Sequence, residues 1–211
     1  MYKKLNITEN HLQVLALFTH GFNKEYYIRE VQRLLKISPR TAQLILGDLE
    51  RKGIIESRVR GKIKTYKLKD TEIAKEYLNL VEQYKNLSFH SKKPMVREII
   101  TKIIPVIQGI GVIFGSYAKG LEREDSDLDI FIAGKCDENA IKKISRLYGI
   151  KINTVVYPVR IFKRELHRDY LLREVLKAHI VFLNAESFIR TVLRSEQGQM
   201  VLETDQGSNL S

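Results

Sequence analysis

Residues 111–120, GVIFGSYAKG, and residues 125–132, DSDLDIFI, carry the strongest structural pattern in this chain and are separated by a short loop. Each half contains a run of apolar residues that is typical of a buried strand. The first run ends directly at Gly115-Ser116, and ten residues separate Ser116 from Asp127. The pattern predicts two strands, one ending in a Gly-Ser pair and the other beginning with an Asp-x-Asp pair.

The Gly-Ser pair has the composition of a phosphate site. A strand that ends in Gly-Ser and opens a short helix directs backbone N–H groups and a hydroxyl at one point, which favours phosphate. Gly115 lets phosphate groups come close to the backbone, and Lys119 supplies a further positive charge. We therefore expect Gly115, Ser116 and Lys119 to bind a nucleotide.

The Asp-x-Asp pair has the composition of a metal site. On a strand, both carboxylates project from the same face of the sheet. Two neighbouring carboxylates repel each other unless a cation neutralises them, and their hard oxygens suit Mg²⁺ or Mn²⁺. We predict that Asp127 and Asp129 are metal ligands and catalytic residues, and that a nucleoside triphosphate is the substrate or ligand.

The whole segment, Phe114-Gly115-Ser116 followed by Asp127-Leu128-Asp129, resembles the signature of the nucleotidyltransferase superfamily that includes DNA polymerase beta, and most closely its minimal nucleotidyltransferases. The resemblance implies a small α/β fold with a mixed sheet, phosphate contacts from Gly115 and Ser116, and metal binding by Asp127 and Asp129. Minimal nucleotidyltransferases of this kind often act as antitoxins that modify a partner toxin. The resemblance therefore also implies a toxin-like protein as a partner.

One position departs from the family pattern. The family usually supplies a third carboxylate from a later strand, and the matching strand here is KINTVVY, residues 151–157, with Asn153 at the expected place. No Asp or Glu occurs from Asn139 to Arg164. An amide can ligate a metal, but it brings no charge and cannot act as a general base. Whether the chain is an active Mg²⁺-dependent nucleotidyltransferase is therefore left open.

The first third of the chain has the pattern of a helix-turn-helix. Ser38 is a good N-cap and Pro39 suits the first helical position of a helix that ends near Gly53. A helix with an apolar stripe, Ile28, Val31, Leu34 and Leu35, precedes it across a short turn. A still earlier helix starts at Thr8 or Asn10. Core positions of the third helix are expected at Ala42, Ile45, Leu46 and Leu49. Its predicted DNA contacts are Arg40, Thr41, Gln43 and Arg51.

Two alternating segments flank Arg60-Gly61-Lys62 and predict a β-hairpin. Residues 57–69 contain six basic residues and no acidic one, so the hairpin should lie along DNA phosphates. Helix-turn-helix and basic hairpin together resemble the winged-helix family of transcription regulators over residues 8–69. The predicted DNA contacts on the hairpin are Arg58, Arg60, Lys62 and Lys64.

The charge is unevenly spread, because residues 1–69 hold 15 Lys and Arg against 6 Asp and Glu, whereas the rest holds 21 against 19. This favours double-stranded DNA as a partner of the first third. The single cysteine, Cys136, excludes an intrachain disulfide. Neither a signal-peptide pattern nor an apolar run of membrane-spanning length is present, so we expect a cytoplasmic protein with no membrane contact.

The expected fold class is α+β in two domains. Residues 1–69 form a winged helix of three helices and a β-hairpin, 70–93 a connecting helix and linker, 94–195 the nucleotidyltransferase-like domain, and 196–211 a flexible tail. The polar stretch 88–94 is the expected linker, and the connecting helix packs between domains or forms a homodimer. Buried helix positions are expected at Ile73, Tyr77, Leu80, Val81 and Tyr84, at Met95, Ile99, Ile100 and Ile103, and at Ile141, Ile144 and Leu147.

Two functions remain. In the first, the chain is a DNA-binding transcription regulator whose nucleotidyltransferase-like domain binds a nucleotide and Mg²⁺. In the second, it is an active nucleotidyltransferase that transfers a nucleoside monophosphate to a protein, as an antitoxin would, to a nucleic acid or to a small molecule. The absence of a third carboxylate favours the first function, and the intact Gly-Ser and Asp-x-Asp pairs favour the second.

Overall fold

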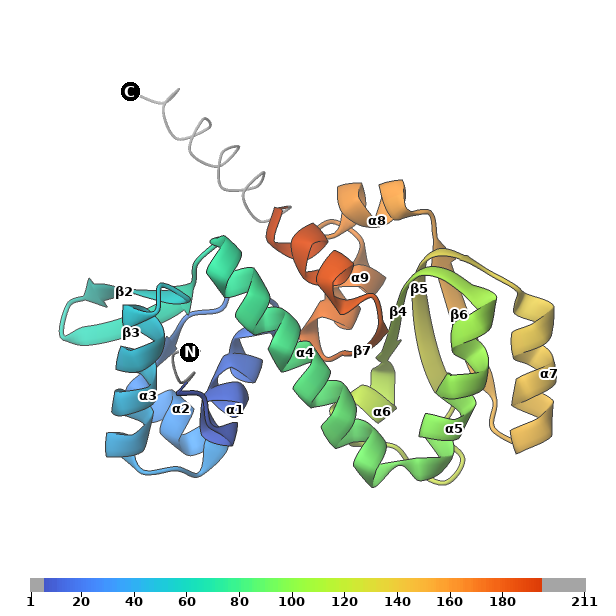
Figure 1. The fold of residues 1–211 in the computed structure, drawn as a ribbon, viewed down its shortest axis with the longest axis horizontal. Coiled ribbons are helices and arrows are strands. Elements are labelled where there is room, and N and C mark those ends of the chain that lie inside the picture. The colour runs from blue at the N-terminus through green and yellow to red at the C-terminus, as the bar shows by residue number, and fades with distance from the viewer. Residues whose placement is uncertain (1–5, 195–211) are drawn as a thin grey trace, which may run out of the picture. The chain divides into compact units, whose positions relative to one another are not determined.

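The computed structural model describes residues 6–194 and divides the chain into two compact units, residues 1–84 and residues 85–211 (Figure 1). Each unit has its own β-sheet and its own apolar core. The α+β class is confirmed in this sense. The domain limits expected at residues 69 and 94 stay a prediction, and the expected tail, residues 196–211, lies outside the described residues.

Unit 1 combines helices with a small antiparallel sheet. The sheet order is β1-β3-β2, so that β3 lies in the middle and pairs with both neighbours. The hairpin of β2 and β3 turns at Gly61 and Lys62, as predicted. The short strand β1 was not expected, because two residues are too few to show an alternation. The elements are α1 (Glu9–Phe18), β1 (Tyr26–Tyr27), α2 (Ile28–Leu35), α3 (Pro39–Arg51), β2 (Ile55–Arg60) and β3 (Ile63–Leu68).

The α3 helix forms where its capping residues predict it. The Thr41 backbone N–H donates to the Ser38 side chain at 3.0 Å, and Pro39 occupies the first helical position. Gly53, just beyond the helix, has a φ of +74° that glycine adopts without strain. All four predicted core residues of this helix are buried. Thr8, one of the two predicted caps of the first helix, is the N-cap of α1. Leu34 of α2 is exposed, although it was expected on the apolar stripe of that helix.

Helix α4 (Glu72–Lys92) corrects the predicted linker, because the chain stays helical to Lys92 and only Lys93 separates it from the next helix. The polar stretch is helical because Phe89 packs against the core of unit 2. The buried stripe of α4 agrees with the prediction at Tyr77 and Val81 but differs at two other positions. Ile73 and Leu80 are exposed, and Ala74 and Leu78 are buried in their place.

Unit 2 is built on a mixed four-stranded sheet with the order β6-β5-β4-β7. The β4 strand runs antiparallel to β5 and β7, and β5 runs parallel to β6. The predicted mixed sheet is therefore confirmed. The labelled elements are α5 (Pro94–Ile103), η1 (Ile104–Val106), β4 (Ile107–Phe114), α6 (Gly115–Lys119), β5 (Leu128–Cys136), α7 (Glu138–Tyr148), β6 (Ile152–Tyr157), α8 (Val159–Glu165), α9 (Tyr170–Lys177) and β7 (Ile180–Leu183). A final helix covers residues 185–194.

Helices cover both faces of this sheet (Figure 1). On one face, α5 and α7 pack on the alternate strand residues Ile113, Ile130 and Ile132. The opposite face contains Phe131, whose ring lies 5.7 Å from the ring of Tyr157 and 5.4 Å from that of Phe162 in α8. We call this second face, covered by α8, α9 and the helix of residues 185–194, the aromatic face.

Two expected core residues of the covering helices are exposed. Met95 lies at the start of α5 and is exposed, and Val96 takes the buried position. Buried residues then follow at Ile99, Ile100 and Ile103, the regular spacing of one helix face. Leu147 of α7 is 72% exposed although its neighbours Ile141 and Ile144 face the core. It lies in the last turn of that helix.

Within residues 6–194, none of the helices combines the length and the apolar character that crossing a membrane requires.

Candidate functional site

The Gly-Ser and Asp-x-Asp pairs meet at one end of the unit 2 sheet. Phe114, the last residue of β4, is the register partner of Asp129 in β5, so that Gly115 follows directly beside Asp129. A Cβ atom built on Gly115 would lie 2.3 Å from Asp129 Oδ2, and the φ of Gly115 is +70°. Both facts favour glycine at this position. The backbone of the first motif therefore lies against a carboxylate of the second.

The parallel pairing of β5 and β6 adds Asn153 to this end of the sheet, since Asn153 is the register partner of Asp129. Its side-chain Nδ2 donates to Asp127 Oδ2 at 3.0 Å and to Asp129 Oδ1 at 3.1 Å. One amide thus bridges the two carboxylates. Asn153 stands in contact with the acidic pair, at the place where the sequence pattern expects a third acid.

Lys151 is a site residue that the motif did not predict. Its Nζ donates to Asp127 Oδ2 at 2.5 Å. The pKa of Asp127 is held below its ordinary value, first by this hydrogen bond from Lys151 and then by the one from Asn153. Parallel pairing of the two strands would have revealed Lys151, because it precedes Ile152, the partner of Leu128.

The residues at this end fit a divalent metal ion. In the part of the chain that the structure describes, no cluster of three or more His, Cys, Asp or Glu side chains could hold a metal. The metal ligands are instead the two carboxylates of Asp127 and Asp129, which the Asn153 amide holds through its NH2 group. Magnesium suits such a set, because it takes one or two carboxylates and completes its shell with water and substrate phosphates. The Asp127 side chain is 32% exposed, so a metal–nucleotide complex can reach it.

The remaining predicted nucleotide residues lie on α6. Ser116 is half-buried in the first turn of this helix. Lys119 is exposed, and its Nζ lies 3.5 Å from Glu174 Oε2 of α9. Glu174 also binds Lys177 at 2.5 Å. A carboxylate of α9 therefore holds Lys119 by an ion pair, and its expected contact with a nucleotide stays a prediction.

The predicted DNA contacts on α3 divide into two pairs. Arg40 and Gln43 are exposed and make no hydrogen bond or ion pair within residues 6–194. Thr41 Oγ1 lies 2.8 Å from Ser38 Oγ, and Arg51 Nη2 lies 3.1 Å from Asp48 Oδ1. The first pair presents open donors and acceptors, whereas the second pair is already bonded to its own helix.

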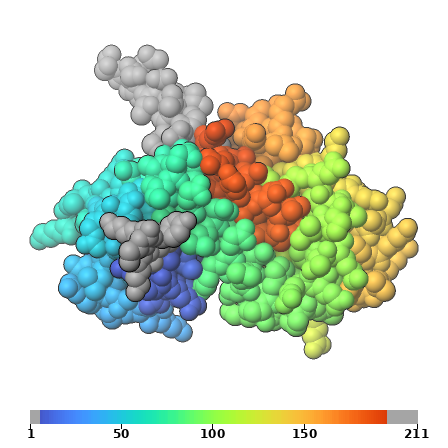
Figure 2. All heavy atoms as spheres, viewed as in Figure 1, coloured from blue at the N-terminus to red at the C-terminus, as the bar shows by residue number. Residues whose placement is uncertain are grey.

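The β2–β3 hairpin, which carries the other predicted contacts, projects from the body of unit 1 (Figure 2). Most of these cations lie beside a carboxylate: Lys64 beside Glu50 at 3.0 Å, Arg60 beside Glu25 at 3.4 Å, and Arg58 beside Glu56 at 3.7 Å. Lys62 at the turn has no ion-pair partner among the described residues. The charge of the hairpin is therefore partly neutralised within unit 1, which the count of basic residues alone did not show.

A strand that ends in a Gly-Ser turn, next to paired aspartates on a mixed sheet, is typical of the class of domains that transfer nucleotides. Residues 94–182 match the family model of the nucleotidyltransferase domain. The chain is also 35% identical over 68 residues to a protein of Methanocaldococcus jannaschii that is named as a protein adenylyltransferase, a match that covers 28% of this chain and 68% of that protein. The chain belongs to the nucleotidyltransferase family.

Two solved structures are similar to a lesser degree. One is a toxin–antitoxin with AMP-PNP, at 15% identity and a TM-score of 0.30, covering 60% of this chain and 94% of that one. The other is TrmBL2, described as an archaeal chromatin protein with a novel mode of DNA binding, at 15% identity and a TM-score of 0.28, covering 82% and 71%. Such low TM-scores do not establish a shared overall fold. The relative's name favours the second of the two expected functions over the first.

Proposed function

We propose that this chain transfers an adenylyl group from ATP to a hydroxyl group of a protein. The observation that carries the proposal is the close approach of Gly115 to Asp129. It brings the Gly-Ser turn and the pair of Asp127 and Asp129 to one end of the sheet. The relative named as a protein adenylyltransferase supports both the nucleotide and the class of acceptor.

Each residue of the site has a role in this reaction. The Gly115-Ser116 turn holds the triphosphate through backbone N–H groups and the Ser116 hydroxyl. Asp127 and Asp129 would hold the metal ion, and Asn153 fixes both carboxylates through its amide. When bound, Mg²⁺ would neutralise charge on the triphosphate and on the departing pyrophosphate. Lys151, which bonds Asp127, neutralises this carboxylate when no metal ion is bound and competes with the metal ion for it.

The site supplies no strong base for the acceptor hydroxyl. Asn153 has no basic atom. Asp127 is a weakened base, because the hydrogen bonds from Lys151 and Asn153 lower its pKa. The proton of the acceptor therefore leaves to solvent or to the substrate phosphates. The consequence is a slow transfer, set by positioning and charge rather than by proton abstraction.

The test uses ATP labelled either at the α-phosphate or at the γ-phosphate. The full chain, Mg²⁺ and a lysate of the source organism are incubated with each, and proteins are separated by denaturing electrophoresis. Adenylyl transfer leaves the α-label but not the γ-label on an acceptor protein. Asp127→Asn/Asp129→Asn should remove the label, and Asp125→Asn, an exposed loop residue of the same segment, should not. A γ-label on the acceptor, or no label in any protein, would refute adenylyl transfer.

For unit 1 we propose duplex DNA binding through a winged helix. The α2–turn–α3 pair followed by the β2–β3 hairpin supports this arrangement. The observation in its favour is the open pair Arg40 and Gln43 on the outer side of α3, since a guanidinium and an amide are the groups that pair best with guanine and adenine edges. The partly neutralised hairpin then adds phosphate contacts, chiefly from Lys62 at the turn.

Binding of labelled duplexes by the full chain tests this second function. Arg40→Ala and Gln43→Ala should each lower discrimination between sequences by about 1–3 kcal/mol, because each removes a side chain that pairs with a base edge. Arg60→Ala and Lys62→Ala should weaken binding to all sequences alike and reduce its salt dependence. Affinity that does not change with salt, or sequence preference altered only by the hairpin variants, contradicts the proposed docking.

A further inference from the structure

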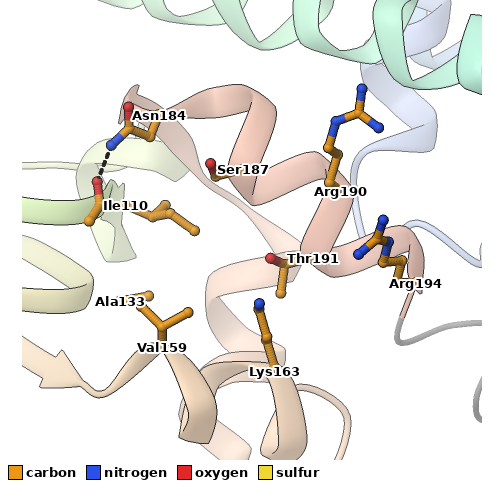
Figure 3. Close-up of a pocket in the computed structure, with 10 residues that line it drawn as sticks. Ile110, Ala133, Val159, Lys163, Asn184, Ser187, Arg190, Thr191 and Arg194 are labelled. Carbon is orange, nitrogen blue, oxygen red and sulfur yellow. Dashed lines mark hydrogen bonds between the residues drawn. The ribbon is translucent and has the colours of Figure 1, made fainter.

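A cavity lies on the aromatic face of unit 2 (Figure 3), away from the end of the sheet that carries the aspartates. Its volume is about 490 Å³, a size that accommodates a mononucleotide. Ile110 and Ala133 form part of its wall, and they are register partners in β4 and β5. Ala133 lies four residues beyond Asp129 on the same face, which separates the two sites by roughly 13 Å along the strand. The cavity is thus distinct from the Gly-Ser and Asp-x-Asp site.

The mouth of the cavity is basic. Three cations line it, Lys163 from α8 and Arg190 and Arg194 from the helix of residues 185–194, and no carboxylate is among the lining residues. Arg190 bonds Glu186 at 2.9 Å. Lys163 and Arg194 are exposed and have no ion-pair partner within residues 6–194. Two cations without counter-charge at the mouth of a cavity favour an anionic ligand.

The polar stripe of the last helix adds hydroxyl groups. Ser187, Arg190, Thr191 and Arg194 follow the i, i+3, i+4, i+7 spacing, so that one helix face lines the cavity. Thr191 is only 9% exposed, and its hydroxyl has no hydrogen-bond partner among the described residues. In Figure 3 Thr191 and Lys163 extend into the same cavity, one from the last helix and the other from α8. The hydroxyl belongs to a residue that lines the cavity, where a phosphate oxygen can accept its hydrogen bond.

The inner wall is apolar. Ile110, Ala133 and Val159 line it, and the ring of Phe162, one residue before Lys163, stacks on Phe188. A ligand that matches the whole cavity has an anionic group for the mouth and a flat, weakly polar part for the wall. We propose that this cavity is a second nucleotide site, which binds a nucleoside monophosphate without a metal ion. Its phosphate contacts Lys163, Arg194 and Thr191, and its base lies on Ile110 and Val159.

Calorimetry with AMP and the full chain in EDTA tests the site, and adenosine and inorganic phosphate are titrated separately. We expect AMP to bind, and Lys163→Ala/Arg194→Ala to weaken it at least tenfold. Thr191→Val, which keeps the volume and deletes the hydroxyl, should weaken it to a lesser extent. The matched control is Lys143→Ala/Arg146→Ala, which removes one exposed lysine and one exposed arginine from α7.

The proposals for the two nucleotide sites can be refuted independently of each other. AMP binding in EDTA that survives Asp127→Asn/Asp129→Asn supports the cavity, whatever the outcome for adenylyl transfer. Loss of AMP binding in that variant alone would assign it to the acidic end and overturn the proposal. Three other results would also overturn the proposal. They are no binding of AMP by the native chain, binding of AMP by Lys163→Ala/Arg194→Ala as tight as by the native chain, and binding of inorganic phosphate as tight as that of AMP.

Discussion

The aromatic face of the unit 2 sheet carries opposite charge at its two ends. At one end Asp127 and Asp129 lie together, compensated by Lys151 and bridged by Asn153. At the other end, cations line a cavity that has no lining carboxylate. A triphosphate can be held at the acidic end only with an added cation, whereas a phosphate can be held at the basic end directly. Removal of the metal ion should therefore abolish triphosphate binding at the acidic end and leave phosphate binding at the basic end unchanged.

The two ends also differ in rigidity. Asp129 and Asn153 lie on paired strands, and the Gly115 backbone lies against the carboxylate, so small changes there displace the reacting groups. Lys163 and Arg194 are long side chains on helices and can follow a ligand. Precise positioning suits chemistry, and adjustable cations suit binding.

The largest expected effect is on the acidic end. Asp127→Asn/Asp129→Asn should lower adenylyl transfer by roughly 10²–10³-fold or more, the usual loss when one charge-stabilising group is removed from an active site. AMP binding in EDTA should not change. The rate of α-label incorporation into the acceptor measures the first effect. Transfer that persists in the double variant would show that the acidic pair does not hold the metal.

Asn153→Asp should increase the rate, because it places a charged ligand and a base beside Asp127 and Asp129. A positioned general base typically contributes about 10²–10⁴-fold, so a gain approaching 10²-fold is expected. Asn153→Ala is the control, since it removes the amide without adding a carboxylate and should lower the rate. Initial rates at saturating ATP and Mg²⁺ report the change. Slower transfer by Asn153→Asp than by the native chain would contradict the role assigned to this position.

Gly115→Ala tests the contact between the two motifs. The added Cβ would displace the Asp129 carboxylate. A displacement of about 1 Å in an active site costs about 10²-fold in rate. Gly120→Ala is a matched control, because Gly120 also has a positive φ, +66°, but no atom lies within 4 Å of its Cβ position. Both variants should lose about 1–2 kcal/mol of stability from the left-handed backbone. Equal transfer rates for the two variants would mean that the Gly115 contact is unimportant.

The smallest effect concerns Lys151, which competes with a metal ion for Asp127. Lys151→Ala should lower the Mg²⁺ concentration for half-maximal transfer by no more than about fivefold, since exposed ion pairs are weak. Lys143→Ala, an exposed lysine of α7, is the control and should leave it unchanged. A higher Mg²⁺ requirement in Lys151→Ala would instead place Lys151 among the groups that hold the triphosphate.

The sequence predicts those parts of the molecule that depend on neighbouring residues. Gly115, Ser116, Asp127 and Asp129 follow one another within two strands and a turn, so that their convergence at one end of the sheet could be expected. The capping of α3 by Ser38 is equally local. Asn153 was recognised because its strand has a fixed place in the family pattern.

Features that depend on distant contacts could not be predicted in this way. Lys163 and Arg194 come from separate helices, and neither belongs to a motif. Glu25, which lies beside Arg60 of the hairpin, is 35 residues away from it in sequence. The helical phase of Met95 and the continuation of α4 past Ser88 depend on the core of unit 2 rather than on local spacing.

We expect the acidic end to bind ATP only together with a metal ion. Calorimetry can measure this by titration of ATP, with Mg²⁺ and then with EDTA, into Lys163→Ala/Arg194→Ala, in which the cavity should contribute little heat. We predict binding with Mg²⁺, none with EDTA, and none in either condition once Asp127→Asn/Asp129→Asn is added. Equal ATP affinity with and without Mg²⁺, or unchanged affinity after loss of both carboxylates, would contradict the account.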